Sequence, residues 1–346
     1  MAMQKEITTA GPLLDGEGRL AQRGYAKTLL LRYDRAAIRA GALRIKEWDY
    51  YIVTNGRFAV ALTVADNAYM GLMSASLLDF EKPWEQTTSV MTFMPRGGTG
   101  LPPTTLAGDV HFENKRCTFD FTLRGGVRRL TCRLEQFKDK KPFSCALTLG
   151  APPPESIVMA TPYADDPLAF YYNQKINCMP ASGTAEFDGR TYVFDGADSF
   201  GTLDWGRGVW TYANTWYWGS ASGRTAAGEA VGFNIGYGFG DTAAATENAI
   251  FYKGRTHKLE QVTFNIPMKD KREDYLRPWT FTSSDDRFVC DFVPVLDRAA
   301  CTDALIIKSD QHQVFGRFTG RLTLDGGEVL EIRDLPGFAE KVVNRW

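Results

Sequence analysis

One stretch of the sequence combines acidic, basic and aromatic side chains at a spacing that suits a binding pocket. Residues 198–220 read DSFGTLDWGRGVWTYANTWYWGS and include four of the eight tryptophans in the chain. If this stretch is one extended strand, its period of two places four aromatic side chains on one face. These four are Trp210, Tyr212, Trp216 and Trp218. An aromatic wall beside Asp204 and Arg207 predicts a ligand pocket, and the alternative is a plain core strand.

Asp204 is the first candidate for acid–base chemistry. A carboxyl group beside an indole ring is partly desolvated and therefore stays protonated to higher pH. A protonated acid can donate to an alkene, an enol ether or a leaving oxygen, and tryptophan faces stabilise the positive charge that develops. The guanidinium of Arg207 can clamp a carboxylate or phosphate of the ligand. The structural alternative is that Asp204 and Arg207 pair with each other and pin a turn.

Three further residues complete the candidate site. Glu247 and Asn248 follow the segment 232–240, whose alternating glycines leave room beside a strand. A glutamate in an otherwise apolar hairpin needs a partner or a function, and His312 can act as an acid or base near neutral pH. The sequence therefore predicts Asp204, Glu247 and His312 as catalytic residues. The predicted substrate contacts are Arg207, Trp210, Tyr212, Trp216, Trp218 and Asn248. A purely structural role is the alternative for each of them.

Motifs for metal, nucleotide and serine chemistry are missing from the sequence. The three histidines have no ligand spacing, and the six cysteines form no C-x-x-C pair, so we expect no metal and reduced thiols. GYGFGD (236–241) is not followed by a helical pattern, and GGTGLPP (97–103) lacks the lysine of a phosphate loop. G-x-S-x-G does not occur. We expect an enzyme, if it is one, to work without a cofactor.

The composition is that of an ordinary globular protein. Of 346 residues, 44% are hydrophobic and 23% are charged, with a net charge of −1. This balance argues against nucleic acid as the main partner. The N-terminus lacks a signal-peptide pattern, and no apolar run reaches the roughly 20 residues of a membrane helix. We expect a cytoplasmic protein with a small hydrophobic or amphiphilic ligand, and the oligomeric state stays open.

The elements that must position these residues are strands. Apolar alternation over strand-like lengths is broken by glycine turns such as Asn55-Gly56, Gly125-Gly126, Asp188-Gly189 and Gly326-Gly327. The segments with this pattern are 49–54, 57–64, 116–123, 127–133, 258–265, 287–295 and 321–335. The best helical candidate is residues 34–44. The pattern predicts an all-β, antiparallel barrel or sandwich, with a second half that opens near residue 180.

The most distinctive segments resemble a bacterial family of unknown function, DUF2804. They are residues 48–80, 198–220, 246–250 and 305–320, together with the ending LPGFAEKVVNRW. Residues 183–206 are also similar to the G-x-x-W-x-D-x-E-W-G region of carotenoid hydratase and AttH-like proteins. In that match Asp204 is the acidic residue before Trp-Gly, and Thr202 replaces an aspartate. One departure is that the family pattern has histidines before Arg345-Trp346, where this chain has Val342-Val343-Asn344.

The resemblance implies two lipocalin-like antiparallel β-barrel halves packed into one unit, over residues 1–175 and 176–346. Because such relatives include hydratases and cofactor-free cyclases, it implies a cofactor-independent hydratase, isomerase or cyclase. Its substrate would be a small apolar or amphiphilic metabolite in a barrel cavity. One alternative is a carrier for a hydrophobic molecule, which needs the aromatic wall but not the acid. Another is a carbohydrate-binding or carbohydrate-active protein, because tryptophan and tyrosine faces stack on sugar rings.

Overall fold

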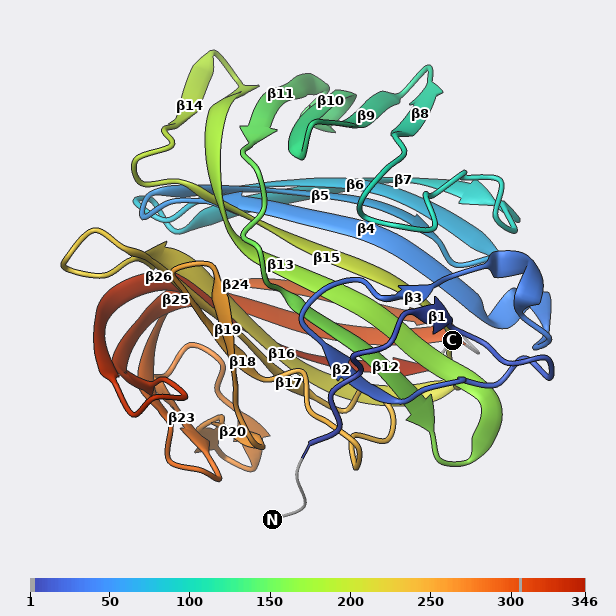
Figure 1. The fold of residues 1–346 in the computed structure, drawn as a ribbon. Coiled ribbons are helices and arrows are strands. Elements are labelled where there is room, and N and C mark those ends of the chain that lie inside the picture. The colour runs from blue at the N-terminus through green and yellow to red at the C-terminus, as the bar shows by residue number, and fades with distance from the viewer. Residues whose placement is uncertain (1–3, 305–306, 346) are drawn as a thin grey trace.

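Two large antiparallel sheets make up most of the molecule (Figure 1). The computed structural model describes residues 4–304 and 307–345. The first sheet contains β2 (Gly24–Ala26), β4 (Ile45–Thr54), β5 (Phe58–Asp66), β6 (Met70–Asp79), β7 (Trp84–Phe93), β8 (Val110–Asn114), β9 (Cys117–Arg124), β10 (Val127–Lys138), β11 (Lys141–Leu149), β12 (Ile157–Tyr163), β13 (Asp166–Phe187), β14 (Arg190–Phe194) and β15 (Phe200–Val209). Its main path runs β7-β6-β5-β4-β15-β13-β11-β10-β9-β8.

The second sheet contains nine strands in the order β19-β18-β17-β16-β26-β25-β24-β23-β20. They are β16 (Ala213–Arg224), β17 (Ala230–Tyr237), β18 (Ala249–Tyr252), β19 (Arg255–Lys258), β20 (Val262–Asn265), β23 (Trp279–Ser283), β24 (Phe288–Ala304), β25 (Ile307–Thr323) and β26 (Val329–Arg345). Two small pairs accompany the sheets: β1 (Gly11–Pro12) with β3 (Leu31–Arg32), and β21 (Met268–Lys269) with β22 (Arg272–Glu273). The structure therefore confirms the all-β prediction with two curled half-barrels.

Alternating side chains and glycine turns build these sheets, as the sequence predicts. Asn55-Gly56 joins β4 to β5, and Asp188-Gly189 joins β13 to β14 with positive φ at both residues. The first sheet curls until β7 meets β10, where the Thr88 hydroxyl donates to the Phe137 carbonyl at 2.6 Å. In Figure 1 the layer β8–β11 lies over the layer β4–β7. Each sheet thus folds back on itself around its own apolar interior.

The predicted helix over residues 34–44 is wrong. The segment forms two single 3-10 turns, η1 (Arg35–Ala37) and η2 (Ala42–Arg44), neither of which buries a residue. Helices in folded proteins depend on an apolar face that packs against the core. This segment lacks that face, and Gly41 interrupts it between the two turns.

Residues 198–220 do not form the single strand that their period of two predicts. β15 lies between β4 and β13 in the first sheet, whereas β16 lies between β17 and β26 in the second. Residues 210–212 connect them, so this stretch is where the chain passes from one sheet to the other. The expected division at residues 175 and 176 falls inside β13, which pairs with β11, β12, β14 and β15 of the first sheet.

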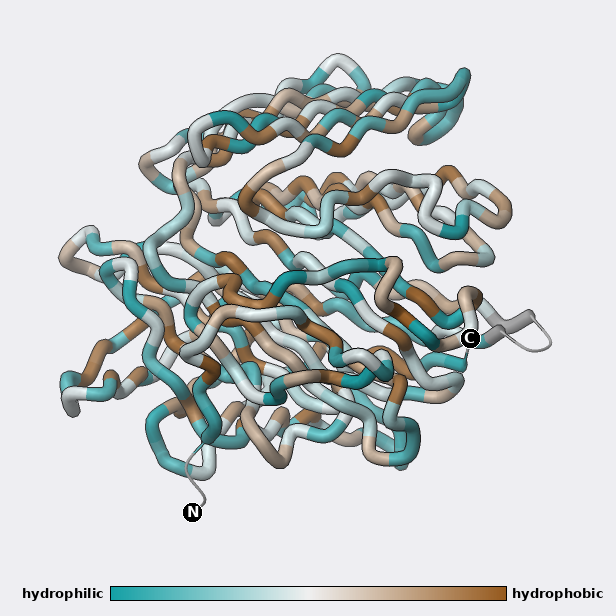
Figure 2. The backbone as a smooth tube through the Cα atoms, turned by 45° about the vertical axis from the view of Figure 1, so that its right-hand side comes forward, coloured by the Kyte–Doolittle hydropathy of each residue, from teal (hydrophilic) through white to brown (hydrophobic). Residues whose placement is uncertain are grey.

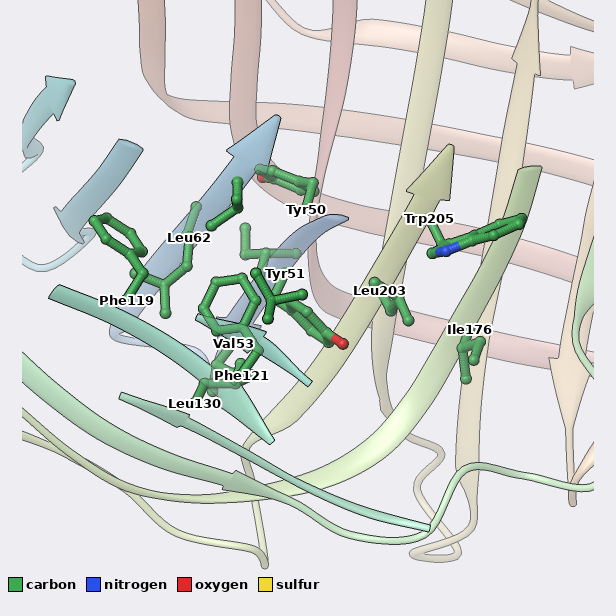
Figure 3. Close-up of a cluster of buried hydrophobic side chains, with 14 of the residues drawn as sticks. Tyr50, Tyr51, Val53, Leu62, Phe119, Phe121, Leu130, Ile176, Leu203 and Trp205 are labelled. Carbon is green, nitrogen blue, oxygen red and sulfur yellow. The ribbon is translucent and has the colours of Figure 1, made fainter. Parts of the chain in front are cut away.

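Apolar side chains fill the interior of both curls and the space between the sheets. Figure 3 shows Tyr51, Phe119 and Phe121 gathered between strands of the first sheet, with Leu203 and Trp205 on β15 nearby. A separate apolar cluster that includes Phe233 fills the second curl. Hydrophilic residues are frequent at the outer hairpins (Figure 2). Within the described residues, no helix has the length and apolar character needed to cross a membrane.

Candidate functional site

The two faces of β15 carry two separate sets of polar side chains. In the antiparallel register, Asp204 lies opposite Tyr50 of β4 and Lys175 of β13, and such opposed residues point to the same face. This face is turned to the second sheet, because the Lys175 ammonium lies 4.1 Å from the centroid of the Trp218 ring. Trp205 points to the opposite face, into the first curl. Asp204 therefore lies between the two sheets.

Arg207 is not part of the Asp204 surroundings. Because the two residues are three positions apart in one strand, their side chains point to opposite faces. The Arg207 guanidinium donates to Asp49 at 2.8 Å and to the carbonyl oxygens of Trp48 and Pro102 at 2.7 Å. Its side chain is fully buried. Neither the predicted substrate anchor beside Asp204 nor the alternative Asp204–Arg207 pair is formed here.

Four ionisable side chains meet between the sheets, and we call them the central cluster: Lys175, Asp204, Glu247 and Glu340. The Lys175 ammonium lies 2.7 Å from Asp204 Oδ1. Trp48 Nε1 donates to Asp204 Oδ2 at 3.2 Å. All four cluster residues are buried, with Asp204 only 6% exposed. The cluster is thus a set of three buried carboxyl groups around one ammonium, and the charge of Arg298 also acts on Glu340.

Glu340 comes to the cluster from β26 of the second sheet. Its two carboxyl oxygens accept hydrogen bonds from Trp216 Nε1 at 2.8 Å and from Gln313 Nε2 at 2.9 Å. Sequence reasoning missed both Glu340 and Lys175. Lys175 follows Gln174 and Glu340 precedes Lys341, so the local sequence does not set either residue apart as a buried charge.

Glu247 reaches the cluster from the loop 238–248 that joins β17 to β18. Gly236 makes room for it, since a Cβ atom at that position would collide with Glu247 Oε1. This confirms the expected space beside the alternating glycines. Glu247 Oε2 accepts a long hydrogen bond from Asn173 Nδ2 at 3.4 Å. Glu247 Oε1 has no hydrogen-bond partner among the residues that the structure describes.

The backbone on both sides of Glu247 is fixed by side chains that lie behind the loop. Asn248 accepts from the Gly236 amide at 2.6 Å and donates to the Glu260 carbonyl at 2.8 Å. The half-buried Lys258 ammonium donates to the carbonyls of Thr246 at 2.6 Å and Asn248 at 2.8 Å. The structure thus gives Asn248, a predicted substrate contact, a set of hydrogen bonds that orient the Glu247 loop.

Electrostatics favours the protonated form of two of the cluster carboxyls. Burial raises the pKa of Glu247, with Lys175 opposing this shift and the Asp204 carboxylate adding to it. Burial also raises the pKa of Glu340, against the hydrogen bond from Trp216. A buried ammonium can balance one carboxylate, and the closest one is Asp204. The cluster therefore places an Asp204–Lys175 ion pair beside two carboxyl groups whose pKa is raised.

Aromatic rings surround the cluster on several sides. Trp48 stacks on Tyr171 at 5.5 Å, and Trp210 meets both rings edge-on. Phe239 stacks on Tyr171 at 5.5 Å and on Trp216 at 5.8 Å. Trp48, Tyr171 and Phe239 lie outside the predicted stretch, so sequence reasoning missed them.

Three of the four predicted wall residues lie around the cluster, and one does not. Trp216 donates to Glu340, and Trp218 Nε1 donates to Asn234 Oδ1 at 2.7 Å. Trp210 packs on Trp216 with ring centroids 5.4 Å apart. Tyr212 is 56% exposed, because residues 210–212 form the connection between the sheets rather than a strand. Placing Tyr212 in the wall is therefore wrong.

His312 lies on the opposite face of the second sheet from the cluster. Its neighbour Gln313 contacts Glu340, and adjacent strand residues point to opposite faces. The His312 ring stacks on Tyr275 at 3.9 Å, and its Nδ1 lies 2.7 Å from Asp297 Oδ2. The hydrogen bond with Asp297 raises the pKa of His312. The structure thus brings together Asp204 and Glu247 but not His312, because His312 and its neighbour Gln313 point to opposite faces of the sheet.

The raised pKa of Glu247 has a measurable effect on stability. Above the ordinary pKa of a glutamate, the folded state binds more protons than the unfolded chain, so the free energy of unfolding falls as pH rises. We expect Glu247→Gln, which cannot ionise, to gain stability relative to the wild type as pH rises from about 5 to 8. The gain is at most about 1.4 kcal/mol per pH unit. Urea unfolding of both proteins at several pH values measures it.

Glu273→Gln provides a control of opposite sign. Although burial opposes the shift, hydrogen bonds from Lys341 and Tyr275 hold the pKa of Glu273 below its usual value. Glu273→Gln therefore loses stability relative to the wild type as pH rises through the acid range. A stability difference between Glu247→Gln and the wild type that does not change with pH would contradict the assignment.

Comparison with known proteins agrees with this architecture. Residues 4–346 match the model of a family described as Domain of unknown function (DUF2804). An AttH-like protein from Nitrosomonas europaea is 13% identical, with 96% of this chain and 98% of that chain covered and a TM-score of 0.53. Kievitone hydratase from Nectria haematococca is 12% identical, with 99% and 97% covered and a TM-score of 0.50. Both predicted resemblances are confirmed, and at these identities the two structures show a shared fold alone.

No curated protein sequence matches the chain significantly. The solved structures therefore show the shared fold alone, and the roles of individual residues rest on the geometry of the central cluster.

Proposed function

We propose that this chain, which belongs to the DUF2804 family, is a cofactor-independent acid–base enzyme of the hydratase, isomerase or cyclase type. Its substrate would be a small apolar or amphiphilic molecule bound between the two sheets. The observation that carries the proposal is a buried carboxylic acid, Glu247, beside a buried Asp204–Lys175 ion pair. Two carboxyl groups in environments that favour different protonation states are the usual equipment for acid and base roles at one site.

The geometry favours Glu247 rather than Asp204 as the acid. Asp204 Oδ1 already lies 2.7 Å from the Lys175 ammonium, so this oxygen is occupied by an ion-pair contact. Glu247 retains its proton more readily because it is buried, and its Oε1 is not engaged by any described residue. The acid role expected for Asp204 therefore passes to Glu247, and Asp204 becomes the charge that stabilises a cationic intermediate.

Hydration of an alkene would begin with protonation by Glu247. Glu247 transfers its proton to one alkene carbon, and the π electrons form the new C–H bond. The neighbouring carbon becomes positively charged, and the Asp204 carboxylate and the Trp216 ring face stabilise it. A water oxygen bonds to that carbon, and the proton that this water loses returns to the Glu247 carboxylate. The reverse sequence is dehydration, and loss of a carbon-bound proton instead of water addition gives isomerisation.

A simple carrier of hydrophobic molecules fits this site less well. Burying carboxyl groups and an ammonium in an apolar wall costs several kcal/mol per ion unless they pair well. A carrier needs only the aromatic surface, so the charged residues would lower its stability without serving the ligand. Kievitone hydratase, which shares the fold, is a hydratase, and this also favours an enzyme over a carrier.

Solvent isotope incorporation tests the proposal without knowledge of the natural substrate. We expect the wild type to introduce oxygen from ¹⁸O-labelled water, or deuterium from D₂O, into at least one member of a panel of alkenes, enol ethers and β-hydroxy ketones. Asp204→Asn should lower that rate at least tenfold because it removes the carboxylate charge. Mass spectrometry of the products measures both rates.

Glu273→Gln is the matched control, because Glu273 is a partly buried, ion-paired carboxylate outside the cluster. Its incorporation rate should equal that of the wild type. Full incorporation by a folded Asp204→Asn protein would overturn the proposed role of Asp204. The absence of incorporation across the whole panel would argue against hydration and isomerisation.

A further inference from the structure

Phe239 occupies the centre of a ring stack that joins the two sheets. Its ring lies between Tyr171 of β13 and Trp216 of β16, with centroid distances of 5.5 and 5.8 Å and interplanar angles of 30° and 27°. Trp48 continues the stack beyond Tyr171 at 25°. Most other aromatic contacts of the central region are edge-on, as between Trp210 and Trp216. The space that Phe239 fills is therefore a flat slot with an aromatic face on each side.

The reactive groups of the central cluster border the same slot. The Lys175 ammonium lies 5.8 Å from the Phe239 ring centroid. A Cβ atom placed on Gly236 would meet both Glu247 Oε1 and the edge of the Phe239 ring, so that oxygen and this ring are neighbours. Glu247 Oε1 and the Tyr171 hydroxyl are both buried, and neither has a hydrogen-bond partner within residues 4–304 and 307–345. Buried polar atoms of this kind are rare in folded proteins unless a ligand or water satisfies them.

The backbone on both sides of Phe239 is packed closely, since a Cβ atom on Gly238 would collide with the Thr215 carbonyl and one on Gly240 with the Pro162 carbonyl. Gly238 and Gly240 flank Phe239 with φ of 93° and 82°, a region that favours glycine. The loop is anchored beyond them, by the Asp241 amide on the Pro162 carbonyl at 2.7 Å and by the Thr246 amide on Gln4 at 2.9 Å. Glu247 and Phe239 lie near opposite ends of the loop, so these anchors hold Glu247 independently of the Phe239 ring.

We infer that Phe239 is a displaceable plug and that its slot receives a planar aromatic or conjugated ring bearing a hydroxyl or carbonyl group. The ring of such a ligand would stack between Tyr171 and Trp216 as Phe239 does, and its polar group would face Lys175, Glu247 and the Tyr171 hydroxyl. This inference rests on the proposed function for the identity of the site, and it adds the chemical class of the substrate. In the closed state the plug competes with the ligand and lowers its apparent affinity.

Calorimetric titration with 2-naphthol, a planar hydroxyl-bearing ring, tests the slot. Phe239→Ala should bind 2-naphthol at least tenfold more tightly than the wild type, because the competing ring is gone. It should also prefer 2-naphthol at least tenfold over the saturated decahydro-2-naphthol, which cannot stack. Adding Trp216→Leu to Phe239→Ala should abolish the gain. If Phe239→Ala does not fold, Phe239→Leu removes the flat ring and keeps apolar volume, and the same gain is expected of it.

Phe264→Ala is the matched control, since Phe264 is as buried as Phe239 and touches three aromatic rings, all edge-on and remote from the cluster. Its affinity should equal that of the wild type. Equal affinity of Phe239→Ala and the wild type, an equal gain in Phe264→Ala, or equal binding of the saturated compound would each overturn the inference.

A double variant that carries Phe239→Ala and Asp204→Asn tests ligand binding in the slot independently of catalysis. The double variant should bind 2-naphthol within threefold of Phe239→Ala, because Asp204 does not form the stack. Retained binding together with absent isotope incorporation in the wild type would leave the slot standing and remove the proposed function. Turnover by the wild type without any gain in binding by Phe239→Ala would leave the proposed function standing and overturn the slot.

Discussion

Glu247→Gln is expected to lower the turnover of any substrate found by isotope incorporation by about 100- to 10,000-fold, the usual contribution of a general acid. The amide has nearly the same shape as the carboxylic acid, but it has no proton to transfer. Gly236 leaves room for either side chain, and Asn173 can still approach the remaining oxygen. Because the same change removes an ionisable group from a buried site, the variant should be far less active and yet more stable than the wild type at pH 8.

The pH profile of turnover identifies the acid directly. Activity of the wild type should fall as pH rises through the raised pKa of Glu247, because the protonated form is the active one. The residual activity of Glu247→Gln should lack this decline. Steady-state kinetics between pH 5 and 9, with Glu273→Gln as a control that keeps the wild-type profile, measure both effects. A Glu247→Gln protein with turnover within threefold of the wild type would contradict the acid role.

Lys175→Met is expected to lower the free energy of unfolding by about 3–5 kcal/mol at neutral pH, the typical cost of leaving a buried charge unpaired. Lys175 is the one ammonium within hydrogen-bond distance of Asp204 among the described residues, and its charge also lowers the pKa of Glu247 and Glu340. Without it, the Trp48 indole is the one hydrogen-bond donor to Asp204 within residues 4–304 and 307–345. Urea unfolding at pH 7.5 measures the loss.

A double variant shows whether the loss arises from charge or from packing. Lys175→Met combined with Asp204→Asn removes both charges, so it should be more stable than Lys175→Met alone. Lys141→Met is the surface control, because Lys141 pairs with Asp188 while both side chains are about half exposed. Surface pairs contribute about 0–1 kcal/mol. Two results would contradict a stabilising Lys175–Asp204 ion pair. One is a free energy of unfolding of Lys175→Met equal to that of the wild type, and the other is a double variant no more stable than Lys175→Met.

Local patterns in the sequence predicted many of the strands and several of their turns, although residues 258–265 contain parts of two strands, β19 and β20, rather than one. Asp188-Gly189 turns a hairpin with positive φ at both residues, whereas at Asn55-Gly56 the Asn55 side chain accepts from the amides of Arg57 and Phe58, and both are properties of the residues themselves. The same local reasoning found Asp204 and Glu247, since a carboxyl in an apolar segment needs a partner wherever the segment lies. It also singled out Trp216 and Trp218, which share one face of β16.

Contacts between distant segments were beyond such reasoning. His312 and Gln313 are adjacent in β25, and only the position of β26 and its Glu340 decides which of them faces the cluster. Similarly, Arg207 is three residues from Asp204 but meets Asp49, because a strand turns alternate side chains to opposite faces. The assumption of one continuous strand misplaced Tyr212, since a period of two continues in the sequence even where the chain leaves the sheet.

By itself, the sequence determined an all-β chain with an acidic, tryptophan-rich stretch at its centre, because alternation and turn chemistry act over a few residues. The tertiary structure alone decided that Lys175, Asp204, Glu247 and Glu340 meet. They come from β13, β15, β26 and the loop 238–248, and two sheets must stack before their charges interact. The change of the chain from the first sheet to the second at residues 210–212 brings the aromatic wall and the carboxyl groups together.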